Sequence, residues 1–287
     1  MTSTPFQPEH LLLLGDNFIR HHDVLQSGTL LDGPQPADAL VRHITRTQTL
    51  ARRTLDVRNS AATMPHLHHS PMIRAGLDRL VQLATLTVLA ADHLLHAADI
   101  LRDTPRTSLS GGPDAAAPSD QHPAESHDVG WHIVRAEQLT ALGAEDCLGL
   151  AGTFARALHQ QHPGPDHRPP SLSATQHATL RAIATGRITH NRHLDKLHVS
   201  PGDNLRVTGA TIRALTSRGL IQREPCPLVL HDRYHLTSAG HQALAAALAH
   251  FQSLAPTTRR PPRRRPAATS LGAPTKLSPG RPSVRQR

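Results

Sequence analysis

The stretch NLRVTGATIRALTSRGLIQREPCPLVLHDRYHLTSAGHQAL, residues 204–244, decides the fold of this chain. It begins with a helical pattern that a glycine ends. Two short runs with strand character follow, and Pro225 and Pro227 separate them, because proline interrupts strands. A second helical pattern then starts at Thr237. This order predicts a helix, a two-stranded hairpin and a closing helix.

The first helix of this stretch is predicted to run from Gly209 to Arg218. Thr208 can act as its N-cap, since a threonine hydroxyl accepts from the first free backbone N–H groups. Ile212 and Leu215 stand three residues apart and predict one buried stripe. Gly219 predicts the stop, because glycine enters the left-handed conformation without strain. A helix of this size is about 15 Å long, which suits the major groove of DNA.

Two pieces of the stretch, TIRALTSRGLIQRE (211–224) and YHLTSAGHQAL (234–244), resemble winged helix-turn-helix regulators of the MarR and PadR kind. The resemblance covers about residues 172–250. It implies a sequence-reading helix over Thr208–Arg218 and a wing around Arg223–Arg233 that touches the DNA backbone. The residues that match the sequence pattern typical of this family, in order, are Leu215, Arg218, Gly219, Leu220, Leu236, Thr237 and Gly240.

The candidate DNA-binding residues carry arginine or hydroxyl side chains. Arginine offers parallel donors to guanine or to a phosphate, and threonine offers a hydroxyl and a methyl group. Thr211 and Arg213 are expected at base edges, and three arginines of the set, 206, 223 and 233, are expected on phosphates. The full set is Arg206, Thr208, Thr211, Arg213, Ser217, Arg218, Arg223 and Arg233.

Residues 188–207 allow two interpretations. Leu194 and Leu197 could belong to the helix that supports the reading helix in a helix-turn-helix. Alternatively, Leu197 and Val199 alternate against Leu205 and Val207 about a turn at residues 201–203, Pro-Gly-Asp, which indicates a hairpin. A hairpin departs from the MarR pattern but leaves the reading helix intact.

The formal net charge of +9 is unevenly distributed along the 287 residues. Residues 251–287 contain arginine and lysine but no acidic residue, and residues 171–250 are also net basic. Residues 1–170 are mildly acidic. Positive charge on the predicted reader and its tail favours a polyanionic partner, namely double-stranded DNA. The tail can add affinity that fades with salt, but it cannot specify sequence.

The predicted fold class is mainly α with a small β-wing. An N-terminal helical domain is followed by a C-terminal winged helix-turn-helix domain and a disordered basic tail. The boundaries are a poorly defined segment 1–35, a helical domain 36–160 with a flexible excursion 104–130, a linker 161–172, the winged domain 173–251 and the tail 252–287.

The clearest N-terminal helix is predicted from Ser70 to Arg102. Its broad apolar face predicts packing against the preceding helix and against a second copy, which makes the chain a homodimer. No apolar run approaches the ~20 residues of a membrane span, and no basic segment precedes the apolar residues 11–14. Cys147 and Cys226 lack paired spacing. We therefore expect a cytoplasmic, nucleoid-associated protein without membrane contact.

Histidine clusters occur in the helical part among 23 histidines in all. Asp92, His96 and Asp99 share one helical face and could hold a divalent ion. The spacing matches no strong metal motif, and no glycine-rich phosphate loop or nucleophile elbow occurs. Hence no metal, no cofactor and no enzymatic activity is predicted.

Together these features predict sequence-specific duplex DNA binding and transcriptional regulation. One alternative is a protein-binding adaptor in a replication or plasmid-maintenance complex. Another is a metal-dependent hydrolase bundle fused to a DNA reader.

Overall fold

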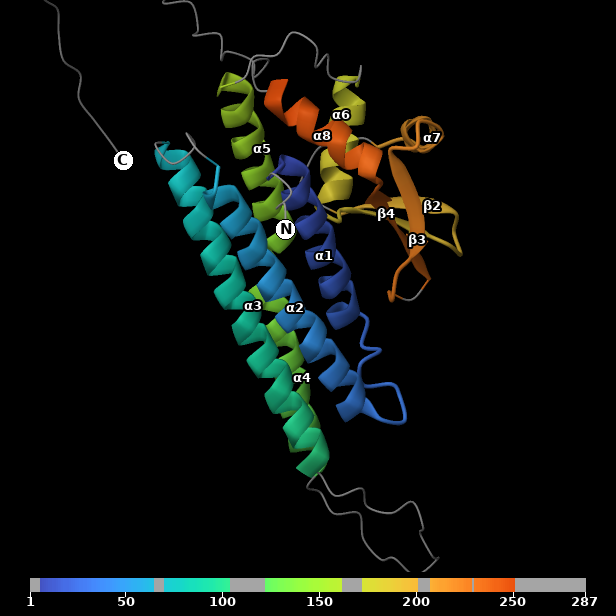
Figure 1. The fold of residues 1–287 in the computed structure, drawn as a ribbon. Helices are drawn as coiled ribbons and strands as arrows, with labels where there is room; N and C mark the ends of the chain where they lie inside the picture. Colours follow the sequence, from blue (N-terminus) through green and yellow to red (C-terminus); the bar gives the residue numbers. More distant parts are fainter. Residues whose placement is uncertain are drawn as a thin grey trace, which may run out of the picture. The chain divides into compact units, whose positions relative to one another are not determined.

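The computed structural model describes residues 6–64, 70–103, 122–161, 172–200, 207–228 and 230–250, with side chains from residue 128 onward in the third range. Five helices precede a part that contains both helices and strands (Figure 1). The predicted mainly α class with a small β-element is confirmed. The elements are α1 (Pro8–Gln26), α2 (Pro36–Ala62), α3 (Pro71–Asp103), α4 (His122–Thr140), α5 (Gly143–Gln161), α6 (Ala174–Ala184), β1 (Ile188–Asn191), β2 (Lys196–Val199), α7 (Gly209–Ser217), β3 (Ile221–Pro225), β4 (His231–Leu236) and α8 (Ser238–His250).

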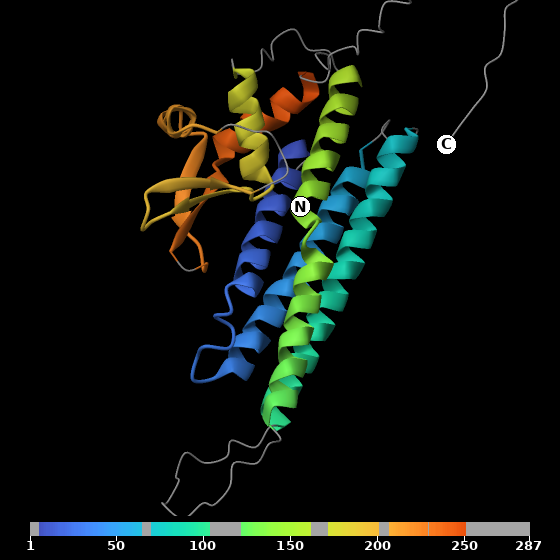
Figure 2. The same cartoon turned by 180° about the vertical axis from the view of Figure 1, so that it is seen from behind.

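The long helices form a bundle in which each helix buries one apolar stripe. α3 lies between α2 and α4, and α1 lies along α5 (Figures 1 and 2). By length and composition α3 could also cross a membrane, and 44% of its most apolar window is buried in this fold. The core helix of a globular bundle passes the same test, so this property is weak evidence for a membrane span.

α1 is a central element that the sequence did not predict. Residues 1–35 were expected to be poorly defined, since a glycine such as Gly15 weakens a helical pattern. Instead Gly15 lies inside α1 because it faces α5 closely, where an added Cβ would lie 3.3 Å from the Cβ of Cys147. Phe18 packs in the same way over Gly143, which has no room for a side chain. α1 therefore continues through Gly15 to Gln26.

The strands form one antiparallel sheet with the order β2-β1-β4-β3. β1 pairs with β2 from Ile188 opposite Val199 to Asn191 opposite Lys196, so a hairpin occurs in this segment, but its turn is at residues 192–195 and not at the predicted residues 201–203. Residues 197 and 199 pair with β1, whereas the sequence suggested that they pair with residues 205 and 207. Asp195 takes a positive φ of 49° in the connecting turn. Among the described residues between α6 and α7 no helix occurs, and residues 201–206 lie outside the described ranges.

Several of the residues that carry the family resemblance lie at the junction between α7 and β3, where they have structural roles. Gly219 has a φ of +67°, and the N–H of Leu220 donates to the carbonyl of Leu215 at 3.0 Å, which closes the helix as predicted. The carbonyl of Leu220 then accepts from the N–H of Thr237 at 3.1 Å. Gly240 contacts that same carbonyl so closely that no Cβ fits there. Thr237 and Gly240, two of the residues that carry the resemblance, therefore join α8 to the end of α7.

The bundle and the sheet share a hydrophobic core. Its buried residues include Leu14 and Phe18 of α1, Phe154 of α5, Leu215 of α7 and Leu244 of α8. Residues 1–253 accordingly form one compact unit, whereas two domains joined by a linker at 161–172 were expected. Most of that linker, most of the excursion 104–130 and the tail lie outside the described residues. α4 begins at His122, inside the range expected for the excursion.

Candidate nucleic-acid interface

α7 presents its polar face to solvent. Ile212 and Leu215 are buried and pack towards α6 and β3, as the stripe predicted. Figures 1 and 2 show α7 at the edge of the sheet, with α6 and α8 between it and α5. Among the other side chains of α7, those of Thr211 and Ala214 are half-buried, and those of Arg213, Thr216 and Ser217 are exposed. The helix is therefore open to a macromolecular partner along its polar face.

The first turn of α7 is fixed by two threonines. The Thr208 hydroxyl oxygen accepts from the backbone N–H of Thr211 at 3.2 Å, so the predicted N-cap is confirmed. The two hydroxyl groups also lie 3.0 Å apart. This capping leaves the N–H groups of Gly209 and Ala210 at an exposed helix end, where the helix dipole favours an anion.

The two arginines of the α7 segment differ in their freedom. A guanidinium nitrogen of Arg213 lies over the first turn, 3.4 Å from where a Cβ on Gly209 would be, so the missing side chain leaves room for it. Arg218 donates to the side-chain oxygen of Gln176 on α6 at 3.4 Å. The Ser217 hydroxyl donates to the carbonyl of Ala214 at 3.1 Å. Both arginines are exposed, and Arg218 is held by a side chain of α6.

The wing carries two arginines that share one carboxylate. Nε of Arg223 on β3 lies 3.5 Å from one oxygen of Asp232, and Nε of Arg192 lies 3.2 Å from the other. Both arginine side chains remain about half exposed, while Asp232 is buried. Arg192 was missing from the sequence-derived set, because only the pairing of β1 with β4 brings its turn to the wing. The N–H of Arg192 donates to the carbonyl of Leu230 in the opposite turn at 2.8 Å.

Arg233 does not belong to the exposed surface, which corrects its predicted phosphate contact. It is 5% exposed, and its Nε donates to Oδ2 of Asp23 on α1 at 2.6 Å. Other guanidinium nitrogens donate to the second oxygen of Asp23 and to the carbonyl of Gly186. In β4, Arg233 lies on the side of the strand that faces α1, so its charge is neutralised inside the fold. Arg206 lies outside the described residues.

A second polar cluster joins α1 to the sheet. Arg20 on α1 donates to Glu224 on β3 at 2.6 Å and to Asp16 at 3.0 Å, and Asp16 also contacts the ring of His235 on β4. Burial alone raises the pKa of the Asp16 carboxyl, but the hydrogen bond from His235 and the charge of Arg20 outweigh it and lower the pKa. The hydrogen bond from Arg20 likewise lowers the pKa of Glu224. These contacts fix the wing sheet on the bundle.

The histidine-rich face of α3 forms no metal cluster among the described residues. The ring of His96 bonds to the carbonyl of Asp92 in its own helix at 2.7 Å and stacks on His132 of α4. His93 lies 3.0 Å from His132 through their Nδ1 atoms. These contacts account for the three imidazoles within the α3–α4 interface.

Comparisons with protein-family models, with curated proteins and with solved structures found no match for this chain.

Proposed function

We propose that this protein binds duplex DNA in a sequence-specific manner and acts as a transcriptional regulator of the winged helix-turn-helix kind. The observation that carries the proposal is the exposed polar face of α7, followed directly by the β3–β4 hairpin. The nine residues of α7 span about 14 Å, a length that fits the major groove. Thr211 and Arg213 face the bases in this arrangement, and Arg223 and Arg192 on the wing hold backbone phosphates.

The support of α7 differs from that of a standard helix-turn-helix. α6 and β3 hold α7 through Ile212 and Leu215, and the β1–β2 hairpin lies on the far edge of the sheet. The turn 192–195 and the start of β4 lie at the same end of the sheet, because Asn191 pairs with His231. The hairpin therefore extends the wing and adds Arg192 to the backbone contacts.

A homodimer is part of this proposal. On α3 the side chains of Val81, Val88 and Leu95 are 41–48% exposed and repeat every seven residues. Such a stripe suits packing against the same stripe of a second copy with two-fold symmetry. Two copies of α7 then present themselves to two half-sites of a palindromic operator.

A protein-binding adaptor is the second candidate. The observation that favours it is the ion pairing of the wing, since Asp232 offsets part of the charge of Arg192 and Arg223. The paired arginines are then weaker phosphate ligands, and the exposed face of α7 is left for a protein partner.

Selection of bound duplexes from a random pool, with the full chain as bait, separates the two candidates. The proposal predicts enrichment of a palindrome with two half-sites. Recovery of a single half-site retains DNA reading and removes the dimer. Recovery of random sequences at every salt concentration removes sequence-specific reading and favours the adaptor.

A further inference from the structure

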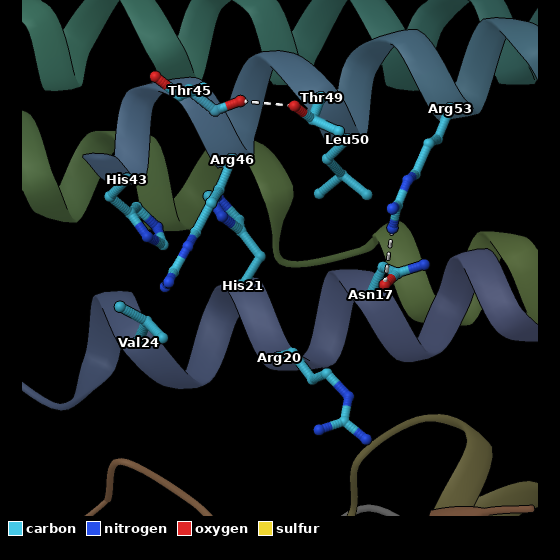
Figure 3. A pocket seen from close by; sticks show the side chains of 10 residues that line it. All are labelled: Asn17, Arg20, His21, Val24, His43, Thr45, Arg46, Thr49, Leu50 and Arg53. Atoms are coloured by element: carbon cyan, nitrogen blue, oxygen red, sulfur yellow. Dashed lines mark hydrogen bonds between the residues drawn. The ribbon is translucent and has the colours of Figure 1, made fainter. Parts of the chain in front are cut away.

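A cavity of about 310 Å³ lies between α1 and α2, on a face of α1 adjacent to the one that holds the sheet (Figure 3). Its size is at the lower end of the range for small-molecule sites, so it fits a ligand of metabolite size. Ten residues line it, and none of them is acidic: Asn17, Arg20, His21, Val24, His43, Thr45, Arg46, Thr49, Leu50 and Arg53.

Two buried imidazoles in this cavity have unused polar atoms. His21 is 6% exposed and His43 is 3% exposed, and their rings stack with centroids 4.7 Å apart and an interplanar angle of 4°. Nε2 of His21 and both ring nitrogens of His43 have no hydrogen-bond partner. Buried polar atoms are normally satisfied, so these three positions indicate a missing partner.

Both imidazoles are neutral at pH 7. Burial lowers the pKa of His21 to about 3 and the pKa of His43 to about 4. A neutral imidazole offers one N–H donor and one acceptor nitrogen. The stacked pair is therefore suited to a ligand that can donate and accept hydrogen bonds.

Of the three arginines that line the cavity, Arg20 is paired with carboxylates, whereas Arg46 and Arg53 have no carboxylate partner among the described residues. Arg46 makes no hydrogen bond or ion pair with another described residue, and Arg53 bonds only to the amide oxygen of Asn17 at 3.4 Å. Figure 3 shows Arg46 and Arg53 extending from α2 towards α1. Arg42 and Arg46 line a smaller cavity that continues the same groove, and no acidic residue lines that one either.

We propose that the α1–α2 cavity binds a small organic anion. Its carboxylate or phosphate group accepts hydrogen bonds from Arg46 and Arg53, for which arginine is well suited. Its apolar part contacts Val24 and Leu50. Because the unpartnered nitrogens of His21 and His43 are buried, the rings must turn towards the cavity before the other polar atoms of the anion bond to them.

Arg20 connects the wall of the cavity to the wing sheet. It lines the cavity and also pairs with Glu224 on β3. Figure 3 shows its guanidinium group extending from α1 away from α2, so the charged end of Arg20 is engaged outside the cavity. The anion site therefore depends on Arg46 and Arg53 and does not rest on the proposed DNA binding.

The test is calorimetric titration of the full chain with benzoate, phenyl phosphate and inorganic phosphate, with benzyl alcohol as the uncharged counterpart. We expect benzoate or phenyl phosphate to bind at least tenfold more tightly than benzyl alcohol. The order of the two organic anions distinguishes a carboxylate site from a phosphate site. Absence of binding by all three anions at millimolar concentration overturns the proposal.

Two variants and one control variant locate the site. Arg46→Gln should weaken anion binding at least tenfold, while Arg52→Gln, an exposed position on the same helix outside the cavity, should leave it unchanged. His43→Leu should raise the melting temperature and weaken anion binding. Equal effects of the two arginine variants, or a stabilised His43→Leu with unchanged anion affinity, contradict the proposal.

Competition with DNA completes the test. If a duplex displaces phenyl phosphate from the wild-type cavity, the cavity binds a phosphate of the DNA backbone, and the small-anion proposal is overturned. A chain that binds phenyl phosphate but no duplex loses the proposed function and keeps the anion site, so the two failures are distinguishable.

Discussion

Arg233 on β4 donates from Nε to Oδ2 of Asp23 on α1 over 2.6 Å, and both side chains are buried. The two residues lie 210 positions apart in the chain. Together with the Arg20–Glu224 pair, this contact fixes the wing sheet on the bundle. The orientation of α7 is therefore set by the whole unit and not by a separate reader domain.

Replacement of Asp23 by Asn should destabilise the protein strongly. Arg233 would keep its buried charge without a compensating carboxylate, and loss of one partner of a buried pair costs about 3–5 kcal/mol. The measurement is the free energy of unfolding in urea. Asp99→Asn is the matched control, because its pair with Arg102 is about half exposed and should contribute less than about 1 kcal/mol. Equal losses in the two variants would contradict the role assigned to Asp23.

Gly240→Ala should destabilise the junction between α7 and α8. The added methyl group meets the carbonyl of Leu220, which is backbone and cannot move aside, so a cost of about 1–3 kcal/mol is expected. Gly149→Ala on α5 is the control of opposite sign. Its Cβ meets nothing within 4 Å, and alanine in a helix should stabilise by about 0.5–1 kcal/mol. Thermal unfolding compares the two, and a tolerated Gly240→Ala would argue against the close approach.

Stability should fall as pH falls from about 6.5 towards 4. Burial lowers the pKa of His21, His43 and His177, the last to about 4. Between these pH values the histidines bind protons in the unfolded chain but not in the folded protein. Protonation therefore lowers the free energy of unfolding by at most about 1.4 kcal/mol per pH unit for each histidine. His43→Leu should reduce the slope of the urea midpoint against pH. An unchanged slope would show that His43 binds protons in the folded protein as readily as in the unfolded chain, which contradicts its lowered pKa.

Local features of the fold were predictable from the sequence, and contacts between distant residues were not. The cap at Thr208, the stop at Gly219 and the buried pair Ile212 and Leu215 depend on neighbours within a few positions, so their pattern is visible in the sequence. The burial of Arg233 depends on a carboxylate on α1, and no local pattern indicates it.

The same reason explains the missing elements of the predicted site. Arg192 joins the wing only through the register between β1 and β4, which the sequence left open. α1 was obscured by Gly15, whose lack of a side chain serves packing against Cys147 and not helix termination. The cavity between α1 and α2 requires both helices in place before its histidines and arginines come together.

Val88→Glu should convert the proposed dimer into a monomer. The charge falls in the middle of the apolar stripe on α3, where its burial against a second copy is unfavourable. Sedimentation at micromolar concentration measures the change. Leu142→Glu, an exposed apolar position outside α3, is the control and should leave the mass unchanged. A wild-type protein that sediments as a monomer removes the dimer from the account.

Duplex binding by Arg213→Ala tests the central claim most directly, with the selected site and random DNA measured at the same salt concentration. Arg213 is exposed on α7, and its contact with a base edge predicts a loss of about 1–3 kcal/mol at the selected site and little change on random DNA. Arg52→Ala, an exposed position on α2, should change neither affinity. Equal losses on both DNAs, or no loss at the selected site, would contradict sequence reading by α7.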